Sequence, residues 1–154
     1  MLRRVQTIAD LQFGSGIGEE LFPDSCRFIT SRRGGVRQVL LDGRRLATLR
    51  AHDGRLTLGL AGGKRLYAAL QAPNGRAMVR DDVISFIAAG KNLFCRHVTG
   101  SDPGIHAGDE VIVVDGQGKF VAIGEAVLSG YEMAEFSTGM AVSVRHGSIE
   151  EEKS

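Results

Sequence analysis

The sequence has little of several residue types that define large classes of protein. Its 154 residues include no tryptophan, three prolines and two cysteines, Cys26 and Cys95, which lie far apart. Two distant cysteines supply neither a disulfide framework nor the ligand spacing of a metal site. We therefore expect two reduced thiols, no metal and no cofactor.

Segments that would place the chain in a membrane are also missing. No apolar run approaches the roughly 18 residues that are needed to cross a bilayer. The opening Met1–Arg4 is followed by Asp10 and polar residues, whereas a signal peptide continues with an apolar stretch. The sequence therefore favours a cytoplasmic protein that does not bind membranes.

What the chain does have is a strong charge asymmetry. Residues 1–80 carry 14 Lys and Arg against 6 Asp and Glu, whereas residues 81–154 carry 5 against 12. Nearly all basic residues of the first half are arginines, whose planar guanidinium binds phosphate with two parallel hydrogen bonds. This pattern indicates a first half that binds a polyanion. The alternative is that an arginine-rich genome simply uses arginine in place of lysine.

Short apolar runs separated by glycine turns fill the first half. Asp42-Gly43 and Asp53-Gly54 each stand between alternating runs, and Asp-Gly is a strong hairpin signal. We expect an antiparallel meander over Cys26–Leu70, with arginines on one face and leucines on the other. Its last strand would be Lys64–Leu70, after a turn at Gly62-Gly63.

The segment before this meander carries no recognisable catalytic motif. We expect residues 1–13 to be a lead-in, and the glycines of Gly14–Gly18 to end a strand and open a short helix. These glycines lack the strand and the Gly-Lys-Ser/Thr ending of a phosphate-binding loop. A Gly-x-Ser-x-Gly nucleophile motif is absent as well. The residues therefore argue against an enzyme.

The second half predicts a strand, one short helix and several further strands. Asp81-Asp82 stand where a helix begins, and Gly90 where it ends. Lys91–Val98 is expected to be a single strand. Further strands are expected over Glu110–Asp115, Phe120–Leu128 and Met140–Arg145, with Gly124 as a candidate bulge.

Taken in order, these residues resemble the PUA domain, named for pseudouridine synthases and archaeosine transglycosylases. No single motif is specific, but the ordered set and its spacings are. The residues that carry the resemblance are Met78–Asp82, Phe86, Gly90–Phe94, Val98, Asp102, Ile105, Gly108–Val114, Ala122–Ala126, Ser129, Glu132-Met133, Gly139–Val142 and Arg145.

The first half resembles the segment that precedes the PUA domain in archaeal tRNA-guanine transglycosylase. That family's catalytic barrel and cysteine-rich zinc site do not fit within this sequence, so the resemblance implies tRNA binding without catalysis. The matching residues are Asp10–Gly14, Gly16, Gly18, Leu21–Pro23, Ser31-Arg32, Thr48–Ala51, Asp53-Gly54, Thr57-Leu58 and Arg65-Leu66.

We therefore expect an α+β, mainly β fold in two domains. A small basic antiparallel α+β domain would cover residues 1–73, and a PUA-like mixed pseudo-barrel residues 75–147, with the turn-rich Ala72–Gly75 between them. Residues 148–154 would form an acidic, disordered tail.

The candidate RNA contacts combine a glycine-led loop with nearby basic residues. Lys91 and Asn92 follow Gly90 where the family's RNA-contacting loop falls; the alternative is a helix end with a solvated lysine. Arg96 would face RNA from a strand whose other face carries Cys95 and His97. His106 could stack on an unpaired base or have no role. Four further residues could line a groove between the domains: Lys64, Arg65, Arg76 and Arg80.

Two functions of different classes remain. In the first, the chain binds tRNA at the acceptor stem and 3′ end, as an accessory of an archaeosine-type transglycosylase on another chain. In the second, it is a protein-interaction subunit whose basic half docks onto an acidic partner without binding RNA.

Overall fold

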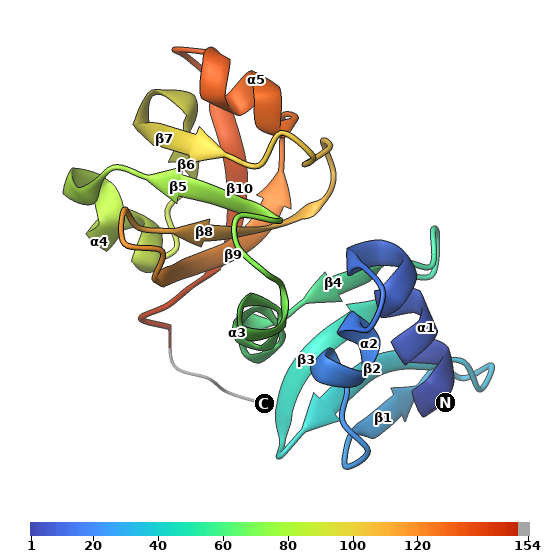
Figure 1. Cartoon of the computed structure of the whole chain (residues 1–154). Helices are drawn as coiled ribbons and strands as arrows, with labels where there is room; N and C mark the ends of the chain where they lie inside the picture. The colour runs from blue at the N-terminus through green and yellow to red at the C-terminus, as the bar shows by residue number, and fades with distance from the viewer. Residues whose placement is uncertain (151–154) are drawn as a thin grey trace. The chain divides into compact units, whose positions relative to one another are not determined.

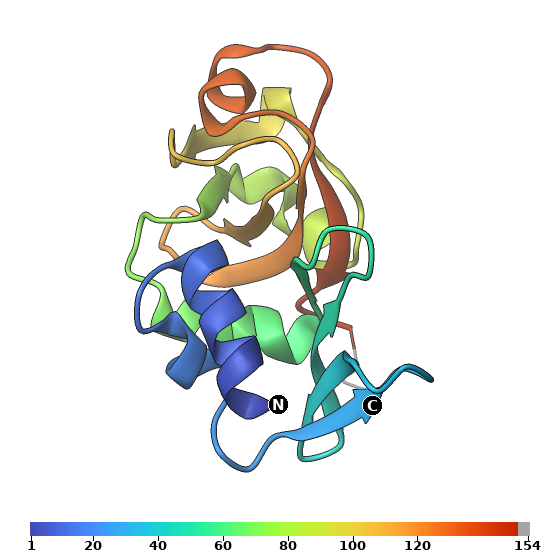
Figure 2. The same ribbon diagram turned by 90° about the vertical axis from the view of Figure 1, so that its right-hand side faces the viewer.

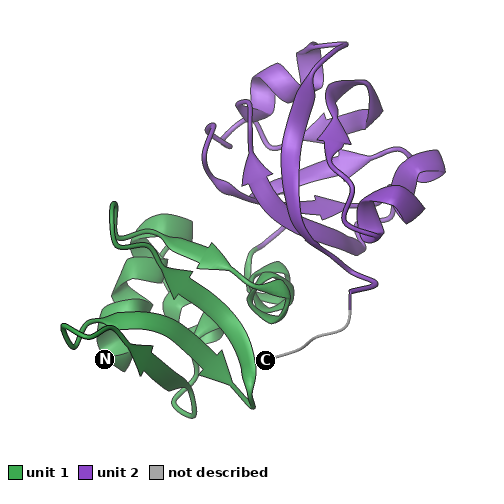
Figure 3. Ribbon diagram, turned by 180° about the vertical axis from the view of Figure 1, so that it is seen from behind, with its two compact units in different colours: residues 1–70, 152–154 green, residues 71–151 purple. Residues whose placement is uncertain are grey.

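A computed structural model of the protein describes residues 1–150. The described residues form two compact units, the first covering Met1–Leu70 and the second starting at Gln71 (Figure 3). Each unit has its own sheet. None of the helices in this part of the chain is long and apolar enough to cross a membrane.

The first unit is an antiparallel four-stranded sheet with three helices. The strands lie in the order β1-β2-β3-β4, and Figures 1 and 2 show α1 and α2 on the same face of this sheet. The elements are α1 (Leu2–Phe13), α2 (Ile17–Leu21), β1 (Arg27–Thr30), β2 (Val36–Leu41), β3 (Arg44–Leu49), β4 (Leu56–Leu58) and α3 (Leu60–Ala69).

The expected lead-in over residues 1–13 is instead helix α1. Val5 and Ala9, one helical turn apart, are fully buried. The side-chain amide of Gln12 then fixes the helix to β4: its Nε2 donates to the Leu56 carbonyl oxygen at 2.9 Å, and its Oε1 accepts from the Leu56 N–H at 2.7 Å. The prediction was wrong because only a narrow stripe of this helix is buried and many of the surrounding positions are polar.

The expected last strand of the meander, Lys64–Leu70, is also wrong, because it lies within helix α3. The glycines Gly62 and Gly63, read as a turn, are buried inside that helix. Gly62 lies so close to β3 that a Cβ atom there would overlap the Leu46 carbonyl oxygen. The glycine pair therefore serves close packing of a helix on a strand, not a change of chain direction.

The second unit is a mixed six-stranded sheet that closes on itself almost into a barrel, in the order β6-β10-β9-β8-β5-β7. Only β5 and β8 pair in parallel. The elements are β5 (Arg76–Val79), η1 (Asp81–Val83), α4 (Ile84–Ala88), β6 (Leu93–Phe94), η2 (Cys95–His97), β7 (Val98–Ser101), β8 (Glu110–Val114), β9 (Phe120–Ala126), α5 (Gly130–Glu135) and β10 (Met140–Gly147).

Two local expectations in this unit are corrected. The strand expected over Lys91–Val98 is broken by the 3₁₀ turn η2, so Cys95 and His97 do not alternate with Arg96 across a strand. The irregularity expected at Gly124 is in the partner strand β10, where pairing skips Arg145. The acidic tail beyond Glu150 lies outside the described residues.

A buried ion pair joins β8 to β10. The Arg145 guanidinium donates to both carboxylate oxygens of Glu110, at 2.6 and 2.9 Å, and only 4% of the Glu110 side chain is exposed. A buried carboxylate requires such a partner, because losing it leaves a charge without compensation. The skipped position in β10 thus supplies the cation for the buried carboxylate of β8.

The packing of α3 on β3 predicts that Gly62→Ala destabilises the first unit. Helix propensity alone favours alanine over glycine by about 1 kcal/mol. Overlap with the Leu46 carbonyl reverses the sign, and we expect unfolding to become easier by about 1–3 kcal/mol. Gly100→Ala in β7, where a Cβ meets nothing within 4 Å, is the control. A raised melting temperature for Gly62→Ala would contradict this packing.

Candidate functional site

Two loops of the first unit lie at one end of its sheet. β1 ends at Thr30 and β2 begins at Val36, while β3 ends at Leu49 and β4 begins at Leu56. Because all four strands are antiparallel, the β1–β2 and β3–β4 connections emerge on the same side. The β2–β3 turn at Asp42-Gly43 lies at the opposite end.

The two loops and the start of α1 enclose a groove of about 910 Å³, which we call the arginine groove. Five of its lining residues are arginines, and no aspartate or glutamate of residues 1–150 is among the others. The remaining lining is aliphatic or small and polar, without an aromatic ring. The lining residues are Arg4, Ile29, Thr30, Ser31, Arg32, Arg33, Gly35, Val36, Arg37, Gln38, Leu49, Arg50, Ala51 and Gly54.

Most of these arginines have no counterion in the structure. Within residues 1–150, the side chains of Arg32, Arg33 and Arg37 form no hydrogen bond or ion pair, and all three residues are exposed. The same holds for Arg4 on α1. Several like charges at one sheet end create a positive potential that attracts anions.

One arginine of the groove is held by an acid in the adjoining loop. Arg50 donates to both carboxylate oxygens of Asp53, at 3.1 and 2.7 Å. The pKa of the Asp53 carboxyl lies below its ordinary value, first because it accepts a hydrogen bond from the Arg55 N–H and further because of Arg50. Asp53 therefore stays ionised and orders the β3–β4 loop.

Models of known families match both halves of the chain. Residues 3–73 match the patch-forming domain C2 of tRNA-guanine transglycosylase, and residues 75–148 match the PUA domain. The chain is a C2 domain followed by a PUA domain. The arginine groove lies wholly in the C2 domain.

Curated relatives of the chain are archaeal tRNA-guanine(15) transglycosylases. The protein of Pyrococcus furiosus is 44% identical over 149 residues, which are 97% of this chain and 25% of the relative. That of Thermoplasma acidophilum is 37% identical over 99% of this chain and 24% of the relative. The chain thus spans about a quarter of the length of these relatives and matches their C-terminal region.

Solved structures share the fold at low sequence identity. A hypothetical protein of Pyrococcus horikoshii has a TM-score of 0.73 and 21% identity, with 97% of this chain and 90% of that chain covered. A PUA domain protein of Thermoplasma acidophilum has a TM-score of 0.64 and 17% identity, with 97% and 89% covered. These likenesses confirm the expected fold class of a small α+β sheet followed by a PUA-like pseudo-barrel.

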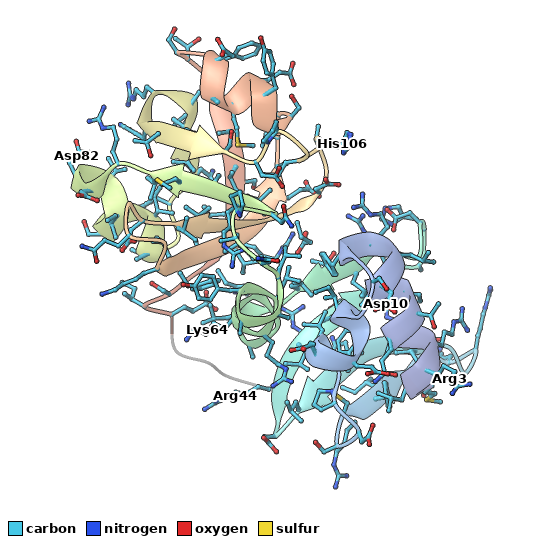
Figure 4. All side chains as sticks on the ribbon, in the orientation of Figure 1. Arg3, Asp10, Arg44, Lys64, Asp82 and His106 are labelled. Carbon is cyan, nitrogen blue, oxygen red and sulfur yellow. The ribbon has the colours of Figure 1, made fainter. Side chains whose placement is uncertain are left out.

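The two candidates on α3, Lys64 and Arg65, differ in the surroundings of their side chains. Arg65 donates to the Leu21 carbonyl at 3.1 Å and to the Glu20 carbonyl at 2.7 Å, so its guanidinium satisfies the last carbonyls of α2. Lys64 is exposed on the same helix (Figure 4). The structure thus gives Arg65 a structural task and leaves Lys64 at the surface.

The two arginines at β5 of the PUA domain are engaged locally. Arg76 is buried, with 8% exposed, and donates to the Asn74 carbonyl at 2.9 Å. Arg80 forms two hydrogen bonds to Asp82, at 3.0 and 2.6 Å, and the pKa of Asp82 is lowered mainly by this bond. Asp82 lies in the first turn of the 3₁₀ helix η1, as expected, and its carboxylate also neutralises Arg80.

The glycine-led loop of the PUA domain presents an exposed cation, Lys91. Gly90 adopts a φ of 102°, in the left-handed region, and Lys91 after it is exposed. The Asn92 Oδ1 accepts from the Val144 N–H at 2.9 Å, so this side chain anchors the loop on β10. Arg96, in η2, is exposed and forms no side-chain hydrogen bond or ion pair with any described residue.

His106 stands apart from the other PUA candidates. Its side chain is 86% exposed, with Nδ1 3.8 Å from the Asp109 carboxylate. Figure 4 shows His106 and Asp82 on different sides of the PUA domain. The PUA candidates therefore do not form one cluster, and no group of three or more His, Cys, Asp or Glu side chains in residues 1–150 could hold a metal.

The arginine groove predicts that loop arginines dominate polyanion binding. Arg32→Glu together with Arg33→Glu should weaken binding to immobilised heparin at least tenfold, because hydrogen bonds to charged groups contribute about 1.5–3 kcal/mol each. The control, Arg27→Glu with Arg44→Glu, makes the same charge change at the opposite end of the sheet, where Figure 4 places Arg44. Equal losses for both variants would show that only net charge matters.

Proposed function

We propose that the chain binds tRNA as an accessory module for tRNA modification, together with a catalytic chain of the transglycosylase type. The arginine groove of the C2 domain supplies most of the affinity, and the PUA domain contributes recognition of the acceptor stem and 3′ end. The chain itself performs no base exchange in this proposal.

The observation that carries the proposal is the groove itself. Five arginines converge there, and among the described residues no acid lines the groove and four of these arginines lack a counterion. Arginines that neutralise RNA phosphates release the counterions condensed on the RNA, so such a surface binds RNA with a strong dependence on salt. Because no aromatic side chain lines the groove, the backbone of RNA fits it better than unstacked bases do.

The relatives point to tRNA as the RNA. The curated relatives are named tRNA-guanine(15) transglycosylases, and the family model that matches residues 3–73 describes a domain of tRNA-guanine transglycosylase. The chain matches only about a quarter of those enzymes. A catalytic chain of the transglycosylase type is accordingly the partner in this proposal.

The PUA domain has the smaller electrostatic share in this proposal. Its residues 71–150 carry 6 Lys and Arg against 10 Asp and Glu, so the domain repels most of an RNA surface. Lys91 and Arg96 are its exposed cations without a side-chain partner in the described part of the chain, apart from Lys119 in the β8–β9 turn. They are suited to holding a few phosphates near the RNA end.

The second candidate is a protein-interaction subunit whose basic groove docks onto an acidic protein. The same unpaired arginines favour it, because carboxylates also match the guanidinium fork. The two functions differ in their ligand: one requires a nucleic-acid backbone, and the other a folded acidic surface. Competition with defined RNAs separates them, whereas salt dependence alone does not.

The first prediction concerns affinity for three RNAs: a tRNA transcript, the same tRNA without its 3′-terminal nucleotides, and a random RNA duplex. We expect the intact tRNA to bind most tightly in a fluorescence anisotropy titration. Arg32→Glu with Arg33→Glu should weaken binding to all three RNAs at least tenfold. The negative slope of log affinity against log salt should become shallower by about two. Equal, weak binding to all three RNAs would refute tRNA recognition.

The second prediction isolates the PUA domain. Lys91→Glu with Arg96→Glu should abolish most of the difference in affinity between intact and 3′-truncated tRNA, while binding to the random duplex changes by less than about threefold. Lys119→Glu is the control for a single charge reversal elsewhere on this domain. If the difference between the two tRNAs persists in the double variant, the 3′ end is recognised elsewhere.

A further inference from the structure

Helix α1 also carries an apolar stripe, Ile8 and Leu11, that is only partly buried against its own sheet. Val5 and Ala9 fill the inner stripe and are fully buried. Ile8, three positions after Val5, is half-buried at the edge of this inner stripe, and Leu11, a further three positions along, is 84% exposed beside it. An exposed apolar stripe on a helix that is already packed is typical of a contact surface.

This stripe forms one wall of a second groove, of about 390 Å³, lined by Ile8, Leu11, Gln12, Gly54 and Arg55. The Gln12 side chain bonds the Leu56 backbone through both its oxygen and its nitrogen. Its polar atoms are thus turned toward β4, and the wall that remains is largely aliphatic. The groove therefore accepts an apolar side chain better than a polar one.

A protein fits this groove better than RNA does. No aromatic ring of the described residues lines it for an unpaired base to stack on, and Ile8 and Leu11 offer an aliphatic surface instead. The basic residues around the stripe are Arg4 one turn before Ile8, and Arg55 in the lining. A complementary partner surface has an apolar side chain at its centre and acidic residues at its rim.

We propose that the outer face of α1, with Leu11 at its centre, is the docking surface for the catalytic chain of the transglycosylase type. This inference rests on the proposed function. In the relatives, the matched region is the C-terminal quarter, so the rest of the enzyme comes before it in sequence. Helix α1 is the first element of that region and therefore the one connected to the preceding part.

The position of the groove also suits a joint function. Gly54 lines both this groove and the arginine groove, so the two are neighbours across the β3–β4 loop. A catalytic chain docked on α1 would lie beside the tRNA-binding arginines. The same domain would then hold the enzyme and its RNA substrate side by side.

The test is site-specific photo-crosslinking of the full chain in the organism that makes it. A benzophenone amino acid replaces Leu11, and the control replaces Ile149, a 69% exposed apolar residue of the PUA domain. We expect a crosslink from position 11, and none from position 149, to a transglycosylase-type catalytic chain identified by mass spectrometry. A crosslink from position 11 to RNA, to a second copy of this chain or to an unrelated protein overturns the proposal, as does no crosslink.

A substitution separates docking from RNA binding. Leu11→Asp should reduce co-purification of the catalytic chain at least tenfold and leave the melting temperature and the tRNA affinity of the purified chain unchanged, because Leu11 is exposed. Ile149→Asp should change neither. Retained co-purification in Leu11→Asp refutes the docking surface. Loss of tRNA binding by the arginine-groove variants is measured without the partner, so it tests the proposed function independently.

Discussion

Antiparallel pairing in the C2 domain is the constraint on which its site depends. Each strand reverses the direction of the last, so the β1–β2 and β3–β4 loops must emerge at the same end of the sheet. Arg32 and Arg33 lie in the first of these loops, and Arg50 at the start of the second. Residues nearly 20 positions apart thus line one groove, and the ligand meets them together.

The sequence predicts the parts of this fold that depend on local signals. The Asp-Gly turn at Asp42-Gly43 was expected, and both its residues have positive φ in the structure. The two helices that were missed, α1 and α3, depend on tertiary contacts instead. Gly62 lies in a helix because β3 needs a close approach there, and nothing within the local sequence distinguishes that glycine from one in a turn.

For the candidate site, the sequence likewise predicts the sign of the charge, but not which charged side chains are already bonded to other groups of the protein. The basic first half was evident from composition, and Arg32, Arg33 and Arg37 belong to it. Composition does not reveal which arginines are already engaged. Arg65 satisfies helix carbonyls, Arg76 is buried and Arg80 is paired with an acid two residues on. These partners are fixed only once the chain is folded, so sequence reasoning named residues that the structure uses internally.

A comparison of two sets of arginines explains why the free ones gather at loop ends. In the PUA domain, Arg145 lies against the buried Glu110, because a charge removed from water is stable only beside its partner. At the exposed end of the C2 sheet, water and salt screen the repulsion between neighbouring guanidinium groups. Unpaired cations are therefore compatible with the fold only where solvent reaches them, which is also where a polyanion can displace that solvent. The surface that tolerates the unpaired arginines is for this reason the surface that is available to bind.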